Sequence, residues 1–276
     1  MISGVVESMV SGDGTAIGCE VTGSGPALVV VHGTLRAARH YRAMAAALAD
    51  DFTVYTMDRR GRGASGPQGA GYDIDTECDD LAAVLAHTGA TMVFGHSFGG
   101  LVGLELARRR ATPITRLAVY EPAVSIGGAY SGSWLPELDS AVADDRIEDG
   151  VISVMRGLEL LGPFTQLPTR LQRAMAKVIM RRDVMDDMRA LLPTVHAEVV
   201  TAIGLDSDGD RYADVTVDTL LITGERGPSY LRGVAEVLDR VMPRSAHRVL
   251  PRCAHNAPEL DAPETIAAEL RRYFTG

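Results

Sequence analysis

The sequence lacks any apolar run long enough to cross a membrane, and it lacks a recognisable secretory signal. A membrane-spanning helix needs about 20 mostly apolar residues, and a signal peptide joins a basic start to a shorter apolar stretch. The opening residues, MISGVVESMVSGDG, show neither feature. We therefore expect a cytoplasmic protein with no membrane among its partners.

Cysteine is also scarce, because the chain has only Cys19, Cys78 and Cys253, at unrelated spacings. An odd number of cysteines without regular spacing predicts neither a disulfide framework nor a zinc site. We expect free thiols in a reducing compartment and no metal.

Positive charge is in short supply as well, since 27 lysines and arginines stand against 36 acidic residues and the net charge is −9. Nucleic acids and anionic membranes bind clustered cationic side chains that displace counterions. The basic runs at 108–110 and 181–182 are short and typical of solvated helix faces or ends. We therefore expect no nucleic-acid partner.

With 46% hydrophobic and 23% charged residues, the composition is that of a globular protein with a substantial core.

What the sequence does contain is a regular alternation of strand and helix patterns. Two short strand patterns flank the turn residues 11–14 and predict a β-hairpin. The run ALVVV at 27–31 is continuously apolar, as in a strand buried on both faces of a parallel sheet. Further strands are predicted at 52–58, 91–94, 114–123, 219–224 and 246–251, and helices at 38–50, 73–89, 98–110, 231–242 and 263–274. This alternation predicts an α/β domain with a mostly parallel sheet and right-handed crossovers.

Residues 125–212 break the alternation. They contain helical periodicity, as in LQRAMAKVIMRRDVMDDMRALL at 171–192, and several prolines, but no convincing buried strand. We predict a helical lid inserted into a core domain that consists of residues 1–124 and 213–276. Methionines in the insertion are most simply packing residues, although methionine also suits an adaptable apolar pocket.

The pattern with the clearest chemistry is GHSFGG at 95–100, where a predicted strand turns directly into a helix. Its first five residues fit G-x-S-x-G, in which small residues permit a tight, strained turn. Ser97 at the apex would project its hydroxyl at the positive end of the helix dipole. A glycine-rich packing turn would not need a serine at this position.

A serine hydroxyl is a weak nucleophile near neutral pH, so a base must accept its proton. His255 is the candidate, because it lies in a loop after the last predicted strand and follows the serine in the chain. His32 and His96 are expected to be structural, bonding to the backbone around the turn.

Two backbone N–H groups are expected to stabilise an oxyanion. The N–H of Phe98 directly follows Ser97 at the start of the helix. The N–H of Thr34 follows an earlier core strand, whose loop approaches the nucleophile in this architecture.

Taken together, HGT at 32–34, MDRRGRGAS at 57–65, GHSFGG at 95–100 and CAHNAPE at 253–259 resemble the α/β-hydrolase superfamily. The resemblance covers the whole chain apart from a loosely matched lid. Within the superfamily, the chain is similar to a group of actinobacterial hydrolases. It implies an eight-stranded sheet, a helical lid after the sixth strand, and a serine-histidine-acid triad without metal or organic cofactor. The superfamily's haloalkane dehalogenases and epoxide hydrolases need a carboxylate where this chain has Ser97.

The chain departs from the superfamily at the usual position of the triad acid. The common pattern after the seventh strand is glycine, two variable residues and aspartate, and here residues 224–227 end in Gly227. Glu121, directly after the sixth predicted strand, is the stronger candidate. The chain would then resemble certain dehalogenases and zearalenone-type lactonases, which place the triad acid after this strand. The strand ends of an α/β sheet converge at one edge, so Glu121 can approach His255. Glu225 remains the alternative.

These residues predict a cofactor-independent serine hydrolase that cleaves a carboxylic ester or lactone through an acyl-enzyme. Ser97 attacks, His255 shuttles the proton, and Glu121 orients the imidazole. The expected substrate is an apolar small molecule of moderate bulk. The candidate pocket walls are Tyr130, Trp134 and Phe164.

Other functions stay open at this stage. Thioesterases, carbon–carbon bond hydrolases and perhydrolases use the same triad on this architecture. The missing aspartate favours a non-catalytic homologue that only binds a small molecule, while Ser97 and His255 speak against it. A homodimer is also left open.

Overall fold

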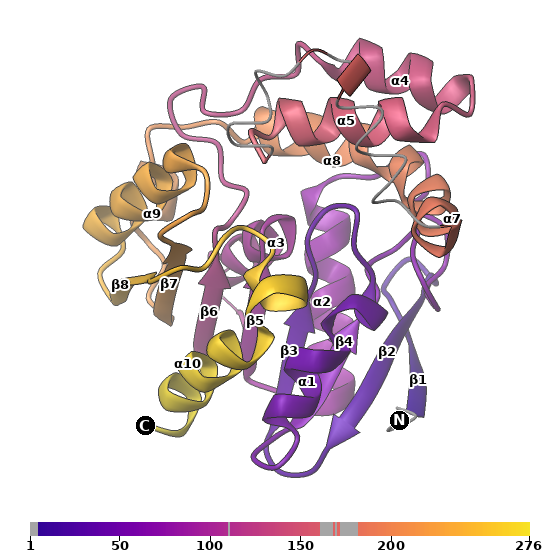
Figure 1. Ribbon diagram of the computed structural model, residues 1–276. Helices are drawn as coiled ribbons and strands as arrows, with labels where there is room; N and C mark the ends of the chain where they lie inside the picture. The colour runs from indigo at the N-terminus through magenta and orange to yellow at the C-terminus, as the bar shows by residue number, and fades with distance from the viewer. Residues whose placement is uncertain (1–4, 110, 161–167, 169, 172–181) are drawn as a thin grey trace.

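A single eight-stranded sheet forms the centre of the computed structural model, in the order β1-β2-β4-β3-β5-β6-β7-β8 (Figure 1). The structure describes residues 5–109, 111–160, 168, 170–171 and 182–276. The strands are β1 Val5–Val10, β2 Ala16–Gly23, β3 Ala27–Val31, β4 Thr53–Met57, β5 Met92–His96, β6 Arg116–Tyr120, β7 Asp218–Gly224 and β8 Ser245–Leu250. The predicted hairpin is β1 and β2, and β2 also pairs antiparallel with β4. All other neighbouring strands are parallel, which confirms the predicted fold class.

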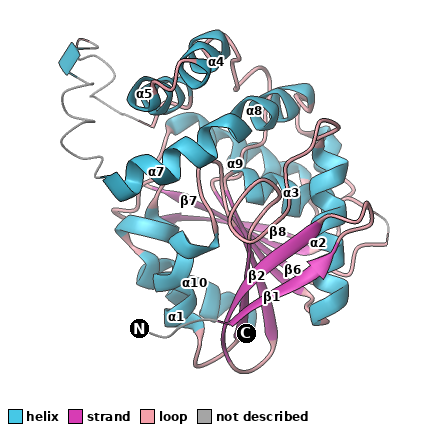
Figure 2. Ribbon diagram, turned by 90° about the vertical axis from the view of Figure 1, so that its right-hand side faces the viewer, coloured by secondary structure: helices cyan, strands magenta, loops and turns pink. Residues whose placement is uncertain are grey.

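The apolar run in β3 is explained by helices on both faces of the sheet. Leu28 and Val30 belong to the core on one face, and Val29 and Val31 belong to the core on the other. The first core is closed by α1 Arg42–Leu48 and α10 Pro263–Thr275, and the second by α2 Ile74–Thr88, α3 Phe98–Ala107 and α9 Ser229–Val241 (Figure 2). A strand of a parallel sheet buried on both faces has no polar side to present.

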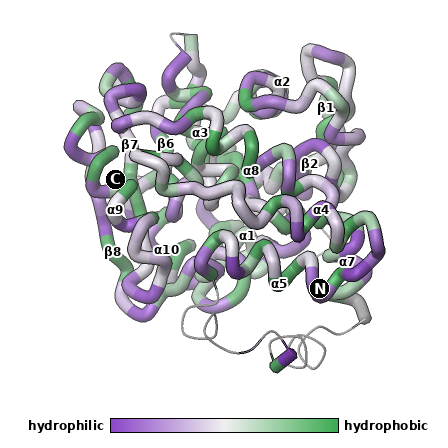
Figure 3. The backbone as a smooth tube through the Cα atoms, turned by 90° about the horizontal axis from the view of Figure 1, so that it is seen from above, coloured by the Kyte–Doolittle hydropathy of each residue, from purple (hydrophilic) through white to green (hydrophobic). Residues whose placement is uncertain are grey.

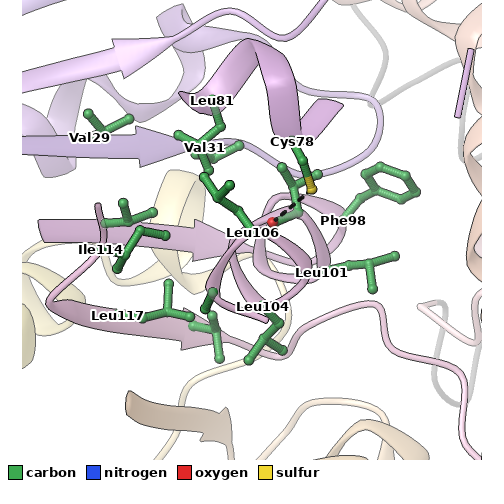
Figure 4. Packing of buried hydrophobic residues seen from close by; sticks show 14 of the residues in the cluster. Val29, Val31, Cys78, Leu81, Phe98, Leu101, Leu104, Leu106, Ile114 and Leu117 are labelled. Carbon is green, nitrogen blue, oxygen red and sulfur yellow. Dashed lines mark hydrogen bonds between the residues drawn. The ribbon is translucent and has the colours of Figure 1, made fainter. Parts of the chain in front are cut away.

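Helix α3 is buried all round, and it forms the base from which Ser97 projects. Every residue from Phe98 to Ala107 is buried. Figure 4 shows Leu101 and Leu104 within the core. The Cys78 thiol of α2 donates a hydrogen bond to the Val102 carbonyl at 3.7 Å. Close packing on all sides leaves such a helix little freedom to shift.

The described part of the chain between β6 and β7 consists of loops and helices. Its helices are α4 Leu135–Ala143, α5 Ile147–Gly157, α7 Arg182–Leu191 and α8 Val195–Gly204. A third apolar cluster joins them to Leu35 in the loop after β3, and Figure 1 shows α4, α5 and α8 above the sheet. Green and purple alternate along these helices in Figure 3, as expected for helices with one buried side. The proposed boundary between core and lid stays a prediction.

None of the described helices has both the length and the apolar character needed to cross a membrane. The short helical turns are η1 Ala38–Tyr41, η3 Leu192–Thr194, η4 Asp210–Tyr212 and the π-helical turn η5 Ala257–Asp261.

A buried group of charges ties the loop after β4 to α2 and α8. Arg59 is fully buried, and its guanidinium donates to the Glu77 carboxylate at 2.7 and 3.0 Å and to Glu198 at 3.0 Å. Arg62 forms a second ion pair with Glu198. Burial opposes ionisation of Glu77, but the charge and hydrogen bonds of Arg59 outweigh it and hold the pKa of Glu77 below its usual value. Each of these charges therefore depends on its partners.

We expect Glu77→Ala to lower the free energy of unfolding by about 3–5 kcal/mol, because it leaves Arg59 buried without its main counter-charge. Urea denaturation measures the change. Glu236→Ala, on the exposed side of α9, is the control and should change stability by less than about 0.5 kcal/mol.

The difference between wild type and Glu77→Ala should also depend on pH. Because the folded pKa of Glu77 is lowered, its contribution is present above the unfolded pKa and is lost as the pH falls through the folded pKa. Equal losses in the Glu77 and Glu236 variants would contradict the importance of the buried charges.

Candidate active site

Ser97 lies at the junction of β5 and α3 in a strained backbone conformation. Its φ is 51° and its ψ is −118°, a combination that residues with a side chain rarely adopt. The glycines on either side are required by close approach. A Cβ on Gly95 would lie 2.5 Å from the Gly99 carbonyl oxygen, and one on Gly99 would lie 2.2 Å from the carbonyl oxygen of Val31. The turn at Ser97 therefore packs directly against the backbone at the end of β3.

The loop after β3 runs directly beside Ser97. A Cβ on Gly33 would lie 3.0 Å from the Cβ of Ser97, and Thr34 lines the same pocket as Ser97. Leu35 follows with a φ of 56°, a further strained residue in this loop. Thr34 and Phe98 therefore both flank Ser97, and their role as oxyanion donors stays a prediction.

Glu121 and His255 are in direct contact. The Nδ1 atom of His255 lies 2.7 Å from Oε2 of Glu121, whose Oε1 accepts the backbone N–H of Gly224 at 2.9 Å. Glu121 is 1% exposed and has a φ of 44°. A carboxylate in this position favours the proton on Nδ1 and leaves Nε2 free to act as a base.

Gly227 supplies the space that the Glu121 carboxylate occupies. A Cβ on Gly227 would lie 1.8 Å from Oε1 of Glu121 and 2.9 Å from Oε2. The two residues meet because β6 and β7 are neighbours, with Tyr120 paired to Ile222. The side chain missing after β7 is thus replaced, in the same volume, by one that enters from the end of β6.

Glu225, the alternative acid, has a different partner. It is exposed, and its carboxylate accepts the backbone N–H of Arg252 at 2.9 Å. This bond holds the start of the loop that leads to His255. The Tyr120 hydroxyl holds the same loop by donating to the Ala254 carbonyl at 2.7 Å.

His32 and His96 are buried and bonded to neighbouring groups. Nε2 of His32 accepts the backbone N–H of Arg59 at 3.0 Å, and Nδ1 of His96 lies 2.5 Å from the Tyr41 hydroxyl. Burial is the main reason that the pKa of both rings lies well below the usual value. Both are therefore neutral near pH 7, and His96 has the Tyr41 hydroxyl as a side-chain partner.

A pocket of about 60 Å³ contains Ser97 and His255. Its polar lining residues are Thr34, Arg36, His96, Ser97, His255, Asn256 and Glu259, and its apolar ones are Leu35, Val154, Met155, Leu158 and Leu160. Larger hollows elsewhere on the described surface are lined by charged residues such as Arg116 and Asp187 and lie away from Ser97. Among the described residues, no three His, Cys, Asp or Glu side chains form a cluster that could hold a metal.

The described apolar lining comes from α5, the residues directly after it and Leu35, rather than from the aromatic residues expected to form it. Tyr130 packs edge-on against Tyr230, with ring centroids 5.6 Å apart. The ring of Trp134 lies against Gly157, where a Cβ would approach it to 2.2 Å. Neither is part of the described lining, and Phe164 lies outside the described residues. Residues such as Val154 were overlooked because their spacing is that of ordinary helix packing.

The family model of the alpha/beta hydrolase family matches residues 28–269. The chain belongs to this family. It is 26% identical over 254 residues to a 2-(acetamidomethylene)succinate hydrolase from Mesorhizobium japonicum. The aligned region covers 89% of the chain and 87% of that protein. It is also 26% identical to a pimeloyl-(acyl-carrier protein) methyl ester esterase from Vibrio cholerae, over 93% of the chain and 97% of that protein.

Two further similarities differ in extent. A crystal structure of an alpha/beta hydrolase from Sphaerobacter thermophilus superposes with a TM-score of 0.80 at 30% identity, over 97% of the chain and 100% of that chain. The uncharacterized hydrolase YraK from Bacillus subtilis is 36% identical over 113 residues, which is 40% of the chain and only 42% of that protein.

We expect Gly227→Ala to displace the Glu121 carboxylate, because the new methyl group would occupy its position. Nuclear magnetic resonance of the His255 ring measures the effect. In wild type the Nδ1 proton should resonate far downfield, as a charge-assisted hydrogen bond requires, and in the variant this signal should be lost. Gly233→Ala, where a Cβ meets nothing within 4 Å, is the control and should retain it. A Gly227→Ala protein with an unchanged downfield signal would contradict this interpretation.

Proposed function

We propose that this hydrolase cleaves a carboxylic ester or lactone through an acyl-enzyme on Ser97. The observation that carries the proposal is the 2.7 Å contact between His255 Nδ1 and Glu121, because His255 lines the same pocket as the strained Ser97. An imidazole oriented by a carboxylate can take a hydroxyl proton on its other nitrogen. The composition of the site therefore favours acyl transfer over simple binding.

In the first half of the reaction, Ser97 Oγ attacks the substrate carbonyl carbon while its proton passes to His255 Nε2. Glu121 stabilises the resulting imidazolium through Nδ1–H. The negative charge on the carbonyl oxygen is stabilised by the N–H groups of Thr34 and Phe98, the second at the positive end of α3. The carbon–oxygen bond then breaks, and the leaving alcohol takes the proton from His255.

In the second half, a water molecule attacks the acyl-enzyme. His255 accepts one proton of this water, a second oxyanion forms in the same position, and Ser97 leaves with the proton returned from His255. The products are a carboxylic acid and the free enzyme. For a lactone, acid and alcohol remain in one molecule.

The choice of an ester or lactone is supported by the pocket and by the relatives. The apolar side formed by Val154, Met155 and Leu158 suits the hydrocarbon part of an acyl chain. One relative is named a methyl ester esterase and matches 93% of the chain. Another relative is named a 2-(acetamidomethylene)succinate hydrolase, so acyl groups other than those of simple esters should also be tested.

We expect a fluorophosphonate reagent to label wild-type protein rapidly and at Ser97 alone, because His255 activates this hydroxyl. Mass spectrometry of the modified peptide identifies the site. Ser97→Ala should not be labelled and should not hydrolyse p-nitrophenyl esters. An inert Ser97 in folded wild-type protein would favour a non-catalytic homologue that binds a small molecule.

We expect Glu121→Gln to lower kcat by at least two orders of magnitude with little effect on KM, because the amide neither fixes the imidazole tautomer nor stabilises the imidazolium. Steady-state kinetics on a p-nitrophenyl ester give both constants. Glu225→Gln is the matched control and should keep near-normal kcat, since its carboxylate bonds to Arg252.

The double variant Glu121→Gly, Gly227→Asp tests the role of the acid independently. It moves the carboxylate to the end of β7 and removes the one that would collide with it. We expect it to be at least about tenfold more active than Glu121→Gly alone, because an acid again contacts the imidazole. Near-normal kcat in the single variant Glu121→Gln would mean that a group other than Glu121 orients the imidazole of His255.

A panel of p-nitrophenyl esters of graded chain length, together with several macrolactones, would identify the acyl group that the enzyme prefers. The same panel separates ester from lactone cleavage.

A further inference from the structure

The turn that follows His255 has an uncommon geometry. Residues Ala257–Asp261 form a π-helical turn, in which one extra residue is accommodated. Such turns are rare and occur often at functional sites. Here the turn directs Glu259 inward, with a side chain that is 4% exposed, while Leu260 is 67% exposed.

Glu259 is a buried carboxylate that has only half of its hydrogen bonds. Its Oε1 accepts Nε–H of Arg36 at 2.9 Å. Its Oε2 is buried, has no hydrogen-bond partner among the described residues, and lies 3.7 Å from His96 Nδ1. Leaving a buried polar atom unpaired costs more than forming one hydrogen bond gains. We therefore expect Oε2 of Glu259 to accept a hydrogen bond from a donor when the site is occupied.

The unpaired oxygen is carried by a residue that lines the pocket at Ser97. Glu259 lines this pocket together with Ser97 and His255. Its partner Arg36 lies two residues after Thr34, in the loop beside which the substrate carbonyl would lie. A donor on the acyl part of a substrate is therefore the group best placed to reach Glu259. Since Arg36 already offsets the charge of Glu259, a neutral donor is sufficient.

We propose that Glu259 is a specificity residue whose Oε2 accepts a hydrogen bond from a neutral hydroxyl or amide N–H on the acyl group. The enzyme would then prefer esters of hydroxy or acylamino acids over esters of plain fatty acids. This inference rests on the proposed serine hydrolase function. It adds the chemical class of the acyl group, which the triad leaves undetermined.

Two sets of three p-nitrophenyl esters test the preference. One set comprises acetate, hydroxyacetate and methoxyacetate, and the other comprises butyrate, 3-hydroxybutyrate and 3-methoxybutyrate. Hydroxyl groups donate and accept, whereas methoxy groups only accept. In wild type, kcat/KM for the hydroxy ester of at least one set should exceed that of both companions by roughly 10- to 100-fold. Ratios near one in both sets would overturn the proposal.

Two variants assign the preference to Glu259. In Glu259→Gln the amide oxygen can still accept from Arg36, but an NH₂ group replaces Oε2, so the methoxy ester should match or exceed the hydroxy ester. In Glu259→Leu the three esters of a set should react within about threefold of one another. Asp261→Asn, an exposed position of the same turn, is the control and should keep the wild-type ratio.

These ratios separate a specificity role from a structural one. A purely structural role for Glu259 would lower kcat/KM for all three esters together and leave their ratio unchanged, which would overturn the proposal. Fluorophosphonate labelling of each variant reports independently whether Ser97 is still activated.

Failure of the proposed function is distinguishable from failure of this inference. If wild type is neither labelled nor active on any ester, binding of hydroxyacetamide and 3-hydroxybutyramide is compared with that of acetamide and butyramide by ligand-observed NMR. Preferential binding of a hydroxy amide that is lost in Glu259→Leu would support the subsite without catalysis. Equal binding would overturn it.

Discussion

The contact between Glu121 and His255 is the constraint on which the rest of the site depends. A carboxylate that is 1% exposed is stable only if its oxygens are bonded, and here one bonds to the imidazole and the other to the N–H of Gly224. Glu121 adopts this arrangement with a positive φ, as Ser97 also does. The two strained turns support each other, because Ser97 donates its N–H to the Tyr120 carbonyl at 3.0 Å and accepts that of Ala123 at 2.9 Å. Strain of this kind persists only where the surroundings determine it fully.

The buried charges behind the site connect this strained region to the helices between β6 and β7. Arg59 pairs with Glu198 of α8, and its guanidinium lies 4.4 Å from the centroid of the Phe98 ring. Its backbone N–H also bonds to His32, in the segment that leads to Thr34. One residue therefore contacts the start of α3, the loop after β3 and α8. Because the cation–π contact and the ion pairs are all desolvated, the position of Phe98 is coupled to the position of α8.

The sequence was sufficient to predict the strands and helices of the core and the strand-to-helix turn at Ser97, but not the contacts within the pocket. The apolar run of β3 and the glycines around Ser97 are local patterns, and each corresponds to a local constraint that the structure contains. Glu121 could be inferred because an acid was missing at Gly227, although their shared volume is visible only in three dimensions. Tyr130 was expected in the pocket from its residue type, which does not specify the direction of a side chain. Glu259 was overlooked because a π-helical turn has no sequence signal comparable to that of an α-helix.

The overlap between the two acid positions makes them mutually exclusive. A separation of 1.8 Å between Oε1 of Glu121 and a Cβ at 227 means that no side chain at 227 can coexist with this arrangement of Glu121. A chain with acids at both positions would have to expel one of them, and a chain with neither would leave the imidazole without a counter-charge. Gly227 is therefore a steric requirement of the position that the Glu121 carboxylate occupies. In relatives with the same strand order, an acid at the position of Glu121 should accordingly be accompanied by glycine at the position of Gly227, since a Cβ there would overlap the carboxylate.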